Sequence, residues 1–199
     1  MLHVVLLGDS ILDNGAYTKG GPDVVAQLRA ALPAGSTATL LAVDGSVASD
    51  VEAQLAHVPS NTSHLVLSAG GNDALMRSDI LQAAVSNASE AFLMLASAVD
   101  AFERAYRQTV RAILALRLPL VICSIYNGNF ADAAVQRCTS LAIAAFDDVI
   151  LRVAAEHEVG VIDLRSVCTT PDDYANEIEP SVKGGAKIAA AIVRAIARA

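Results

Sequence analysis

Three short polar segments of the sequence carry a hydroxyl, a backbone N–H and an amide that could bind or react with a ligand. Gly8-Asp9-Ser10 directly follows an apolar run and offers a serine hydroxyl, which attacks a carbonyl carbon once a neighbouring base takes its proton. Asp44-Gly45 offers the backbone N–H of a glycine, and Gly70-Gly71-Asn72-Asp73 offers a neutral side-chain amide. Donors of this kind stabilise the negative charge that develops on the carbonyl oxygen. Each segment taken alone is equally typical of a turn or a helix cap.

The elements that must position these segments alternate along the chain. Five apolar runs have the length of β-strands and are bounded by Gly, Pro, Asp or Asn; they cover residues 2–7, 37–43, 64–68, 118–124 and 159–163. Helical stretches lie between and after them, over residues 23–32, 50–58, 89–116, 132–157 and 181–198. Prolines precede or follow several of these stretches, as expected where helices begin or end.

This order predicts a single α/β domain over residues 1–199. The strands are almost continuously apolar, which is expected when helices cover both faces of a parallel sheet. Right-handed crossovers then give a three-layer α/β/α sandwich with an open five-stranded parallel sheet. Ligands of such sheets bind at the carboxyl ends of the strands. The three polar segments all follow strands, so we expect them to meet in one crevice.

Composition and charge limit the partners. Of the 199 residues, 54% are hydrophobic and 18% are charged, which excludes a disordered chain. The formal net charge of −7 disfavours nucleic acids and anionic membranes and leaves small ligands open. No apolar run reaches the roughly 18 residues of a membrane span.

Three irregularly spaced cysteines and the absence of a leader pattern predict a cytoplasmic protein. No residue spacing suggests a metal site, and no cofactor is expected.

Four segments, taken in order, resemble the signature blocks of a known family. Gly8-Asp9-Ser10, the glycine of Asp44-Gly45, and Gly70-Gly71-Asn72-Asp73 are similar to the first three blocks of the SGNH (GDSL) hydrolases, and residues 178–189 are similar to the stretch that carries the last block. The resemblance implies a flavodoxin-like α/β fold and an enzyme that cleaves a small carboxylic ester, thioester or acetylated carbohydrate. It also implies that Ser10 is the nucleophile. The N–H groups of Ser10 and Gly45 and the side chain of Asn72 would form the oxyanion hole, and Asp9 would brace the loop.

The sequence departs from this family at the base. The family's last block is Asp-x-x-His, whereas the segment that aligns with it, just before Pro180, reads Asn176-Glu177-Ile178-Glu179. Asn176 therefore stands in the place of the aspartate and Glu179 in the place of the histidine. Because both positions differ, natural divergence is favoured over an introduced change.

Glu179 could itself act as the general base. Its ordinary pKa of about 4.3 is low for that task, but burial or a second carboxylate such as Glu177 would raise the pKa. Asn176 could orient the carboxylate by a hydrogen bond, as the third member of a catalytic triad does. Alternatively, a carboxylate at this place could have no catalytic role and only interact favourably with the positive end of the dipole of the last helix. We therefore expect slow turnover, restricted to activated or otherwise favoured substrates.

The four histidines are not expected to replace the missing base. His3 and His64 begin predicted strands, and His57 and His157 lie near the ends of helices that run antiparallel to the strands. All four are therefore expected at the edge of the sheet opposite the crevice, in structural or surface roles.

Two other functions remain open at this level. A protein of the same fold that binds an acyl or sugar ligand without turning it over would explain the missing histidine. A flavodoxin-like domain that binds a phosphate or nucleotide would use the same strand ends, although the sequence has no Walker or G-x-G-x-x-G pattern. Around the crevice, Asp13, Asn14, Tyr126 and Asp163 could contact a substrate.

Overall fold

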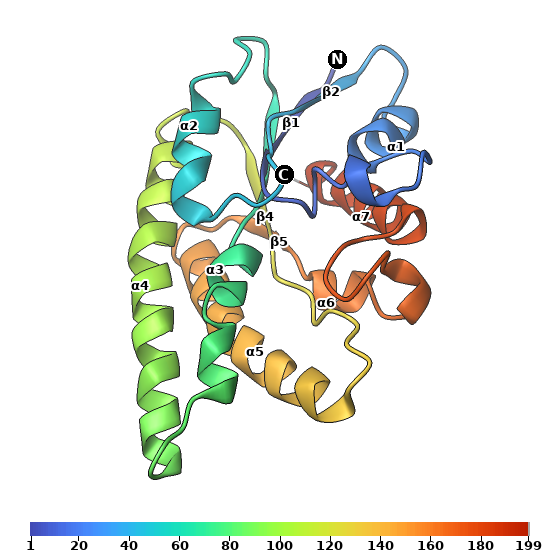
Figure 1. The fold of residues 1–199 in the computed structure, drawn as a ribbon. Coiled ribbons are helices and arrows are strands. Elements are labelled where there is room, and N and C mark those ends of the chain that lie inside the picture. Colours follow the sequence, from blue (N-terminus) through green and yellow to red (C-terminus); the bar gives the residue numbers. More distant parts are fainter. Residues whose placement is uncertain (199) are drawn as a thin grey trace.

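The computed structural model describes residues 1–198 and contains one five-stranded sheet in the order β2-β1-β3-β4-β5 (Figure 1). Every neighbouring pair of strands runs in parallel. The strands are β1 His3–Gly8, β2 Thr37–Leu40, β3 His64–Ser68, β4 Leu120–Cys123 and β5 Gly160–Ile162. The chain leaves β1 for β2 on one side and returns to β3 on the other. This reversal opens a crevice at the carboxyl ends of β1 and β3.

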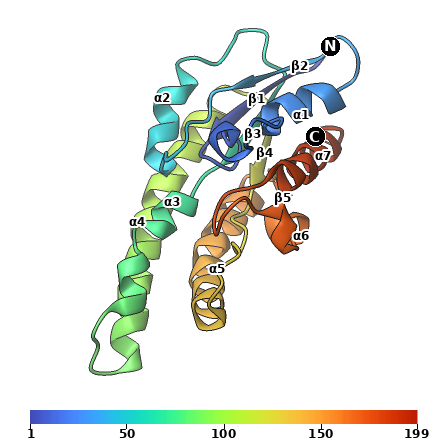
Figure 2. The same ribbon diagram turned by 45° about the vertical axis from the view of Figure 1, so that its right-hand side comes forward.

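Helices cover both faces of the sheet, which gives the predicted three-layer α/β/α sandwich (Figure 2). The main helices are α1 Val24–Ala31, α2 Val51–Leu55, α4 Ala88–Leu114, α5 Ala133–Glu156 and α7 Val182–Ile196. Alternate residues of β1 divide between the two layers: Val4 and Leu6 pack in the core with α1 and α7, and Val5 and Leu7 pack in the core with α4 and α5. All four side chains are fully buried, which explains the uninterrupted apolar run.

Side-chain caps fix several helix boundaries close to their predicted places. The carboxylate of Asp23 accepts from the N–H of Ala26, and the carboxylate of Asp132 accepts from the N–H groups of Ala134 and Val135. The hydroxyl of Ser181 accepts from the first turn of α7 in the same way. Polar side chains at these positions satisfy N–H groups that have no partner inside the helix. These three residues, predicted as the first of their helices, are therefore the residues that cap them.

The second strand is shorter than its apolar run predicts. The N–H groups of Leu41 and Ala42 both donate to the carbonyl oxygen of Leu6, each at 2.9 Å. Two consecutive residues thus face one residue of β1, which breaks the regular ladder and ends β2 at Leu40. The predicted helix over residues 50–58 is also shorter: a turn of 3₁₀ helix, Ala48–Asp50, leads into α2.

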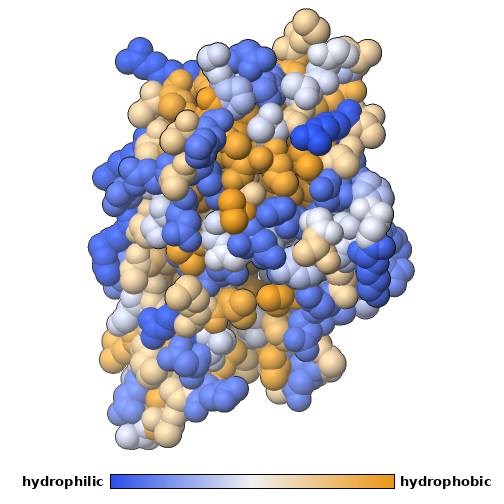
Figure 3. Space-filling view, turned by 45° about the horizontal axis from the view of Figure 1, so that its top comes forward, coloured by the Kyte–Doolittle hydropathy of each residue, from blue (hydrophilic) through white to orange (hydrophobic). Residues whose placement is uncertain are grey.

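The amino-terminal halves of α4 and α5 extend past the carboxyl edge of the sheet (Figure 1). The first buried residue of α4 is Ala98, and the first of α5 is Phe146. Large apolar side chains on these extensions remain exposed, including Phe92 at 62% and Leu141 at 67%. On the face shown in Figure 3, further hydrophobic residues gather between α1 and α2, over the β2 edge of the sheet. None of the helices formed by residues 1–198 has both the length and the apolar character that a membrane crossing requires.

Candidate active site

Ser10 lies at the carboxyl end of β1 because the chain turns sharply at Gly8. Gly8 has a φ of +124°, and a Cβ at this position would overlap the carbonyl oxygen of Ser68 on β3. The N–H of Asp9 donates to that same carbonyl oxygen at 3.1 Å. A glycine is required here by both the close approach and the positive φ. The turn leaves the Ser10 side chain 7% exposed, at the switch point of the sheet.

Two further side chains hold this turn. The amide of Gln54 on α2 binds both backbone groups of Gly8: its Oε1 accepts from the N–H and its Nε2 donates to the carbonyl, each at 2.8 Å. The carboxylate of Asp9 accepts from the N–H of Ile11 and from the hydroxyl of Ser68, each at 3.2 Å. The bonds made by Asp9 agree with the bracing role that we expected for it.

The hydroxyl of Ser10 donates a hydrogen bond to Glu179 Oε1 at 3.1 Å. The two residues are 169 positions apart in the sequence, so this contact exists only in the folded chain. Glu179 is 5% exposed, and its Oε2 has no hydrogen-bond partner among residues 1–198. A serine hydroxyl and a carboxylate therefore lie within hydrogen-bonding distance, the geometry that serine activation requires.

The loop that carries Glu179 is held through its backbone. Asn176 Oδ1 accepts from the N–H groups of Ile178 and Glu179, at 2.9 and 2.8 Å. The N–H of Ala175 donates to the carbonyl of Glu179 at 2.8 Å, which closes the loop. Asn176 itself is exposed. Asn176 therefore holds Glu179 by a hydrogen bond to its backbone N–H, whereas among residues 1–198 no hydrogen bond joins the Asn176 amide to the Glu179 carboxylate.

Asn14 and Tyr126 join this loop to the body of the protein. Asn14 is fully buried; its Nδ2 donates to the carbonyl of Pro180 at 3.1 Å and its Oδ1 accepts from the N–H of Val24 at 2.9 Å. Tyr126 is 4% exposed, and its hydroxyl donates to the carbonyl of Ile178 at 2.5 Å. The expectation that Asn14 and Tyr126 contact substrate is wrong, since both are buried and their polar groups bind the protein.

The three candidate oxyanion donors lie on loops that contact one another. Gly45 is exposed with a φ of +82°, and neither its N–H nor that of Ser10 has an acceptor among residues 1–198. Asn72, in the short helix α3 Gly71–Leu75, donates from Nδ2 to the carbonyl of Ser46 at 2.9 Å. Asp73 accepts from the N–H of Ala48 at 2.9 Å, so it ties the same two loops together and does not cap a helix.

Burial sets the electrostatics of the site. It raises the pKa of Glu179 to about 7, against a smaller lowering by the hydrogen bond from Ser10 and with a further increase from the negative charge of Asp44. Burial likewise raises the pKa of Asp9 to about 7, although the N–H of Ile11 and the hydroxyl of Ser68 stabilise its charged form. Glu179 is thus a stronger base than an exposed glutamate, with a pKa near neutrality.

Comparison with known proteins identifies the family. The model of the GDSL-like lipase/acylhydrolase family matches residues 6–186. The chain belongs to this family. Membership places it, at the level of the family, among ester-cleaving hydrolases. No curated protein matches the sequence.

Solved structures share the fold of this GDSL-family chain at low sequence identity. An extracellular lipase from Streptomyces rimosus has a TM-score of 0.74 and 19% identity, with 98% of this chain and 100% of that one covered. A phospholipase A1 from Streptomyces albidoflavus has a TM-score of 0.72 and 18% identity over 97% and 98% of the two chains. An acetylxylan esterase from Geobacillus stearothermophilus has a TM-score of 0.68 and 20% identity over 98% and 94%. At these identities the likeness concerns the fold.

The histidines of this GDSL-family chain have partners or positions away from Ser10. The ring of His3 bonds Asn61 Oδ1 at 2.9 Å and Thr39 Oγ1 at 2.8 Å, at the start of β1. His64 begins β3. His157 follows α5 and lines a surface hollow of about 870 Å³ beside β5. His3, His64 and His157 lie toward the opposite end of the strands, as the strand order predicted. For His57 the prediction is not confirmed, because this residue follows α2 and lines a surface hollow together with Asp44, Gly45 and Ser46.

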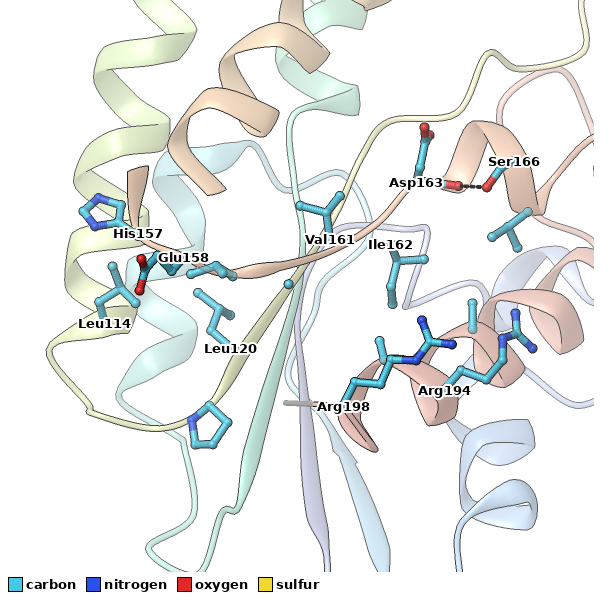
Figure 4. Close-up of a pocket in the computed structure, with 16 residues that line it drawn as sticks. Leu114, Leu120, His157, Glu158, Val161, Ile162, Asp163, Ser166, Arg194 and Arg198 are labelled. Atoms are coloured by element: carbon cyan, nitrogen blue, oxygen red, sulfur yellow. Dashed lines mark hydrogen bonds between the residues drawn. The ribbon is translucent and has the colours of Figure 1, made fainter. Parts of the chain in front are cut away.

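Asp163, which we expected to contact the substrate, lines the same hollow beside β5. Figure 4 shows Asp163 beside β5, with His157 at one side of the hollow and, at another, Arg194 of α7 and Arg198, which follows that helix. The Asp163 carboxylate pairs with Arg165 at 2.8 Å and accepts from the hydroxyl of Ser124 at 3.0 Å. The expectation of a substrate contact is wrong, because Asp163 caps the short helix α6 Leu164–Val167.

A second hollow, of about 540 Å³, lies next to the loop that follows β2 and carries Gly45. Asp44, Gly45 and Ser46 line it together with residues of α2. Gly45, which is exposed, therefore borders open space at the surface. Within residues 1–198, no group of three or more His, Cys, Asp or Glu side chains is arranged to hold a metal ion.

Proposed function

We propose that this GDSL-family chain is a serine esterase in which Ser10 is the nucleophile and Glu179 is the general base. The observation that carries the proposal is the 3.1 Å hydrogen bond from the Ser10 hydroxyl to Glu179 Oε1. In this proposal Glu179 and Asn176 take the places of the histidine and aspartate of the family. The substrate is a small carboxylic ester, a thioester or an acetylated carbohydrate.

In the first half of the reaction, ionised Glu179 takes the proton of the Ser10 hydroxyl while Ser10 Oγ attacks the carbonyl carbon. A tetrahedral intermediate forms, and its negative charge lies on the former carbonyl oxygen. The bond to the alcohol then breaks, and protonated Glu179 returns the proton to the departing oxygen. The products are the free alcohol and an ester of the acyl group with Ser10.

In the second half, a water molecule takes the place of the alcohol. Glu179 removes one proton from this water, and the resulting hydroxide attacks the acyl carbon. The tetrahedral intermediate then collapses, the bond to Ser10 Oγ breaks, and the proton held by Glu179 returns to Ser10. The carboxylic acid leaves and the enzyme is restored.

The oxyanion is bound by the N–H of Ser10, the N–H of Gly45 and Nδ2 of Asn72. The first two have no acceptor among residues 1–198 and so can donate without breaking a bond. Asn72 Nδ2 carries two hydrogens and uses one for the carbonyl of Ser46. That bond fixes the amide in place, so the second hydrogen is free to donate. Preorganised neutral donors of this kind supply much of the rate enhancement in acyl transfer.

A buried glutamate differs from a histidine in two ways that matter here. Its pKa of about 7 makes it a base of useful strength at neutral pH. After it accepts a proton it is neutral, whereas an imidazole would become a cation beside the oxyanion. Glu179 therefore gives the oxyanion no positive neighbour, and we expect slower turnover than with a histidine at the same place.

The test is hydrolysis of p-nitrophenyl acetate by the wild type, Ser10→Ala and Glu179→Gln. We expect turnover in the wild type, background rates in Ser10→Ala, and a loss of about 10²–10⁴-fold in Glu179→Gln, the usual contribution of a general base. Asn176→Asp combined with Glu179→His should raise kcat, because it rebuilds the family's pair. Labelling of Ser10 by a fluorophosphonate, which forms an Oγ–P bond and releases fluoride, locates the nucleophile by mass spectrometry.

Equal rates for the wild type and Ser10→Ala would overturn the proposal. A wild type that does not turn over, but is stabilised against heat by an acetylated ligand, would establish the alternative of a binding protein of this fold. In that case Glu179→His with Asn176→Asp would be the first active form.

A further inference from the structure

The mouth of the Ser10 site is bordered by carboxylates that belong to two different loops. Asp13 follows Ser10 by three residues, and its Oδ2 accepts from the N–H of Asp44 at 3.0 Å. Asp44, which follows β2, accepts on Oδ2 from the hydroxyl of Tyr17 at 2.7 Å. These contacts fix two carboxylates and one aromatic ring, Asp13, Asp44 and Tyr17, as one rim beside the nucleophile. We refer to these three residues as the acidic rim.

The protein places no cation against this charge. None of the ion pairs within residues 1–198 includes Asp9, Asp13, Asp44 or Glu179. Lys19, two residues after Tyr17, is exposed and forms none of these pairs either. Other carboxylates are paired with a cation, as Asp173 is with Lys187 at 2.7 Å. The negative charge around Ser10 is therefore not balanced by an ion pair within the protein, and a bound cation could balance it.

The pKa values of Tyr17 and Glu179 show that the charges of the acidic rim and of Glu179 influence one another. The pKa of Tyr17 is raised to about 12, first by its hydrogen bond to Asp44 and also by the charges of Glu179 and Asp13. The charge of Asp44 in turn adds to the raised pKa of Glu179. Like charges that influence one another in this way create a negative potential, which attracts a cation and repels an anion.

A second feature belongs to Glu179, on which the charge of Asp44 acts. Glu179 is 5% exposed, yet its Oε2 finds no donor among residues 1–198. A buried carboxylate oxygen without a partner is costly to ionise, and a positive charge nearby lowers that cost. A cation at the rim would favour the charged form of Glu179, the form that accepts the proton of Ser10.

We propose that the preferred substrates are esters whose alcohol part carries an ammonium group, held by the acidic rim. The inference rests on the proposed function and names its substrate class. The alcohol side is chosen because the departing oxygen must receive its proton from Glu179, and Asp44, whose carboxylate accepts from the Tyr17 hydroxyl at 2.7 Å, is the rim residue whose charge acts on Glu179. Tyr17 adds an aromatic ring, which together with carboxylates is suited to quaternary ammonium groups.

The experiment compares two esters of the same shape, acetylcholine and 3,3-dimethylbutyl acetate, in which carbon replaces the positive nitrogen. Acetate release gives kcat and KM at low and at high NaCl concentration. We expect kcat/KM to be about tenfold or more higher for acetylcholine at low salt, mainly through KM. This preference should shrink at high salt, because ions screen exposed charges.

Single charge removals show where the preference arises. In Asp44→Asn, the amide oxygen can still accept the hydrogen bond from the Tyr17 hydroxyl. In Asp13→Asn, it can still accept the hydrogen bond from the N–H of residue 44. Each variant therefore keeps the loop contact and loses one charge. Each should lower the ratio of kcat/KM for acetylcholine to kcat/KM for the neutral ester several-fold, because any change in the base strength of Glu179 affects both esters and cancels in this ratio. Asp100→Asn, which removes an exposed carboxylate from α4, is the matched control and should keep the full preference.

Equal kcat/KM values for the two esters would overturn the inference while the esterase proposal stands. A preference that persists in both rim variants would also overturn it, since the charge would then act from elsewhere. If neither ester is hydrolysed faster than by Ser10→Ala, the esterase proposal fails and the substrate class fails with it.

Discussion

Replacing Glu179 by glutamine should change how the stability of the protein depends on pH. Folding raises the pKa of this carboxyl from 4.5 to about 7, mainly by burial. Below pH 4.5 the group is protonated in both states and does not affect stability. As the pH rises toward 7, the unfolded chain loses the proton while the folded chain keeps it, so the folded state becomes less favoured. Above pH 7 the whole penalty is present.

The size of the effect follows from the pKa difference. At about 1.4 kcal/mol for each pKa unit, the rise from 4.5 to about 7 corresponds to about 3 kcal/mol. The free energy of unfolding of Glu179→Gln, relative to the wild type, should therefore increase by about 3 kcal/mol between pH 4 and pH 8. Any constant cost of the amide beside Ser10 cancels, because only the change with pH is compared. Urea denaturation, followed by circular dichroism at constant ionic strength, measures it.

Glu177→Gln is the matched control, since Glu177 lies two residues away and is exposed. It should leave the pH dependence of the wild type unchanged. A stability difference between Glu179→Gln and the wild type that stays constant from pH 4 to pH 8 would refute the reasoning. It would mean that the Glu179 carboxyl is solvated in solution and that burial does not make it a base.

Three further predictions concern the reaction. The wild-type kcat/KM for p-nitrophenyl acetate should rise with pH and level off above about pH 7, where Glu179 is ionised; a profile that falls over this range would contradict the base role. Asn72→Ala should lower kcat by about 10²–10³ with a small change in KM, as for the loss of one oxyanion donor; an unchanged kcat would remove Asn72 from the hole. Tyr126→Phe deletes the bond to the Ile178 carbonyl. It should destabilise the protein by about 1–3 kcal/mol in urea titrations and lower kcat more than it raises KM, whereas full stability and activity would show that the Glu179 loop does not need it.

The sequence predicts the architecture well because burial on both faces leaves a direct trace in the strands. The run of apolar residues in β1 and β3 identifies central strands of a parallel sheet, and the rule that ligands bind at carboxyl ends then groups Ser10, Gly45 and Asn72. Elements of four or five residues, such as α3 and α6, are too short to show a helical period. They were therefore not predicted.

The supporting contacts of the site could not be predicted from the sequence. Gln54, Asn14 and Tyr126 all bind backbone atoms of distant segments, and a backbone partner leaves no pattern of residue types. Asn14 and Tyr126 follow strands and so resemble substrate contacts until their burial is known. For Gln54 one signal was present: it is a polar residue at a helix position between Val51 and Leu55, on the side that faces the sheet.

The distance along the chain between Ser10 and Glu179 has a consequence for biosynthesis. When the ribosome has produced β1, the serine is already present, but nothing nearby can take its proton. The base arrives only after the segment beyond residue 170 has been made and α7 has docked beside α1. If Glu179 is the base, as proposed, a partly synthesised chain has an unactivated serine, and activity begins only when the last helix completes the fold.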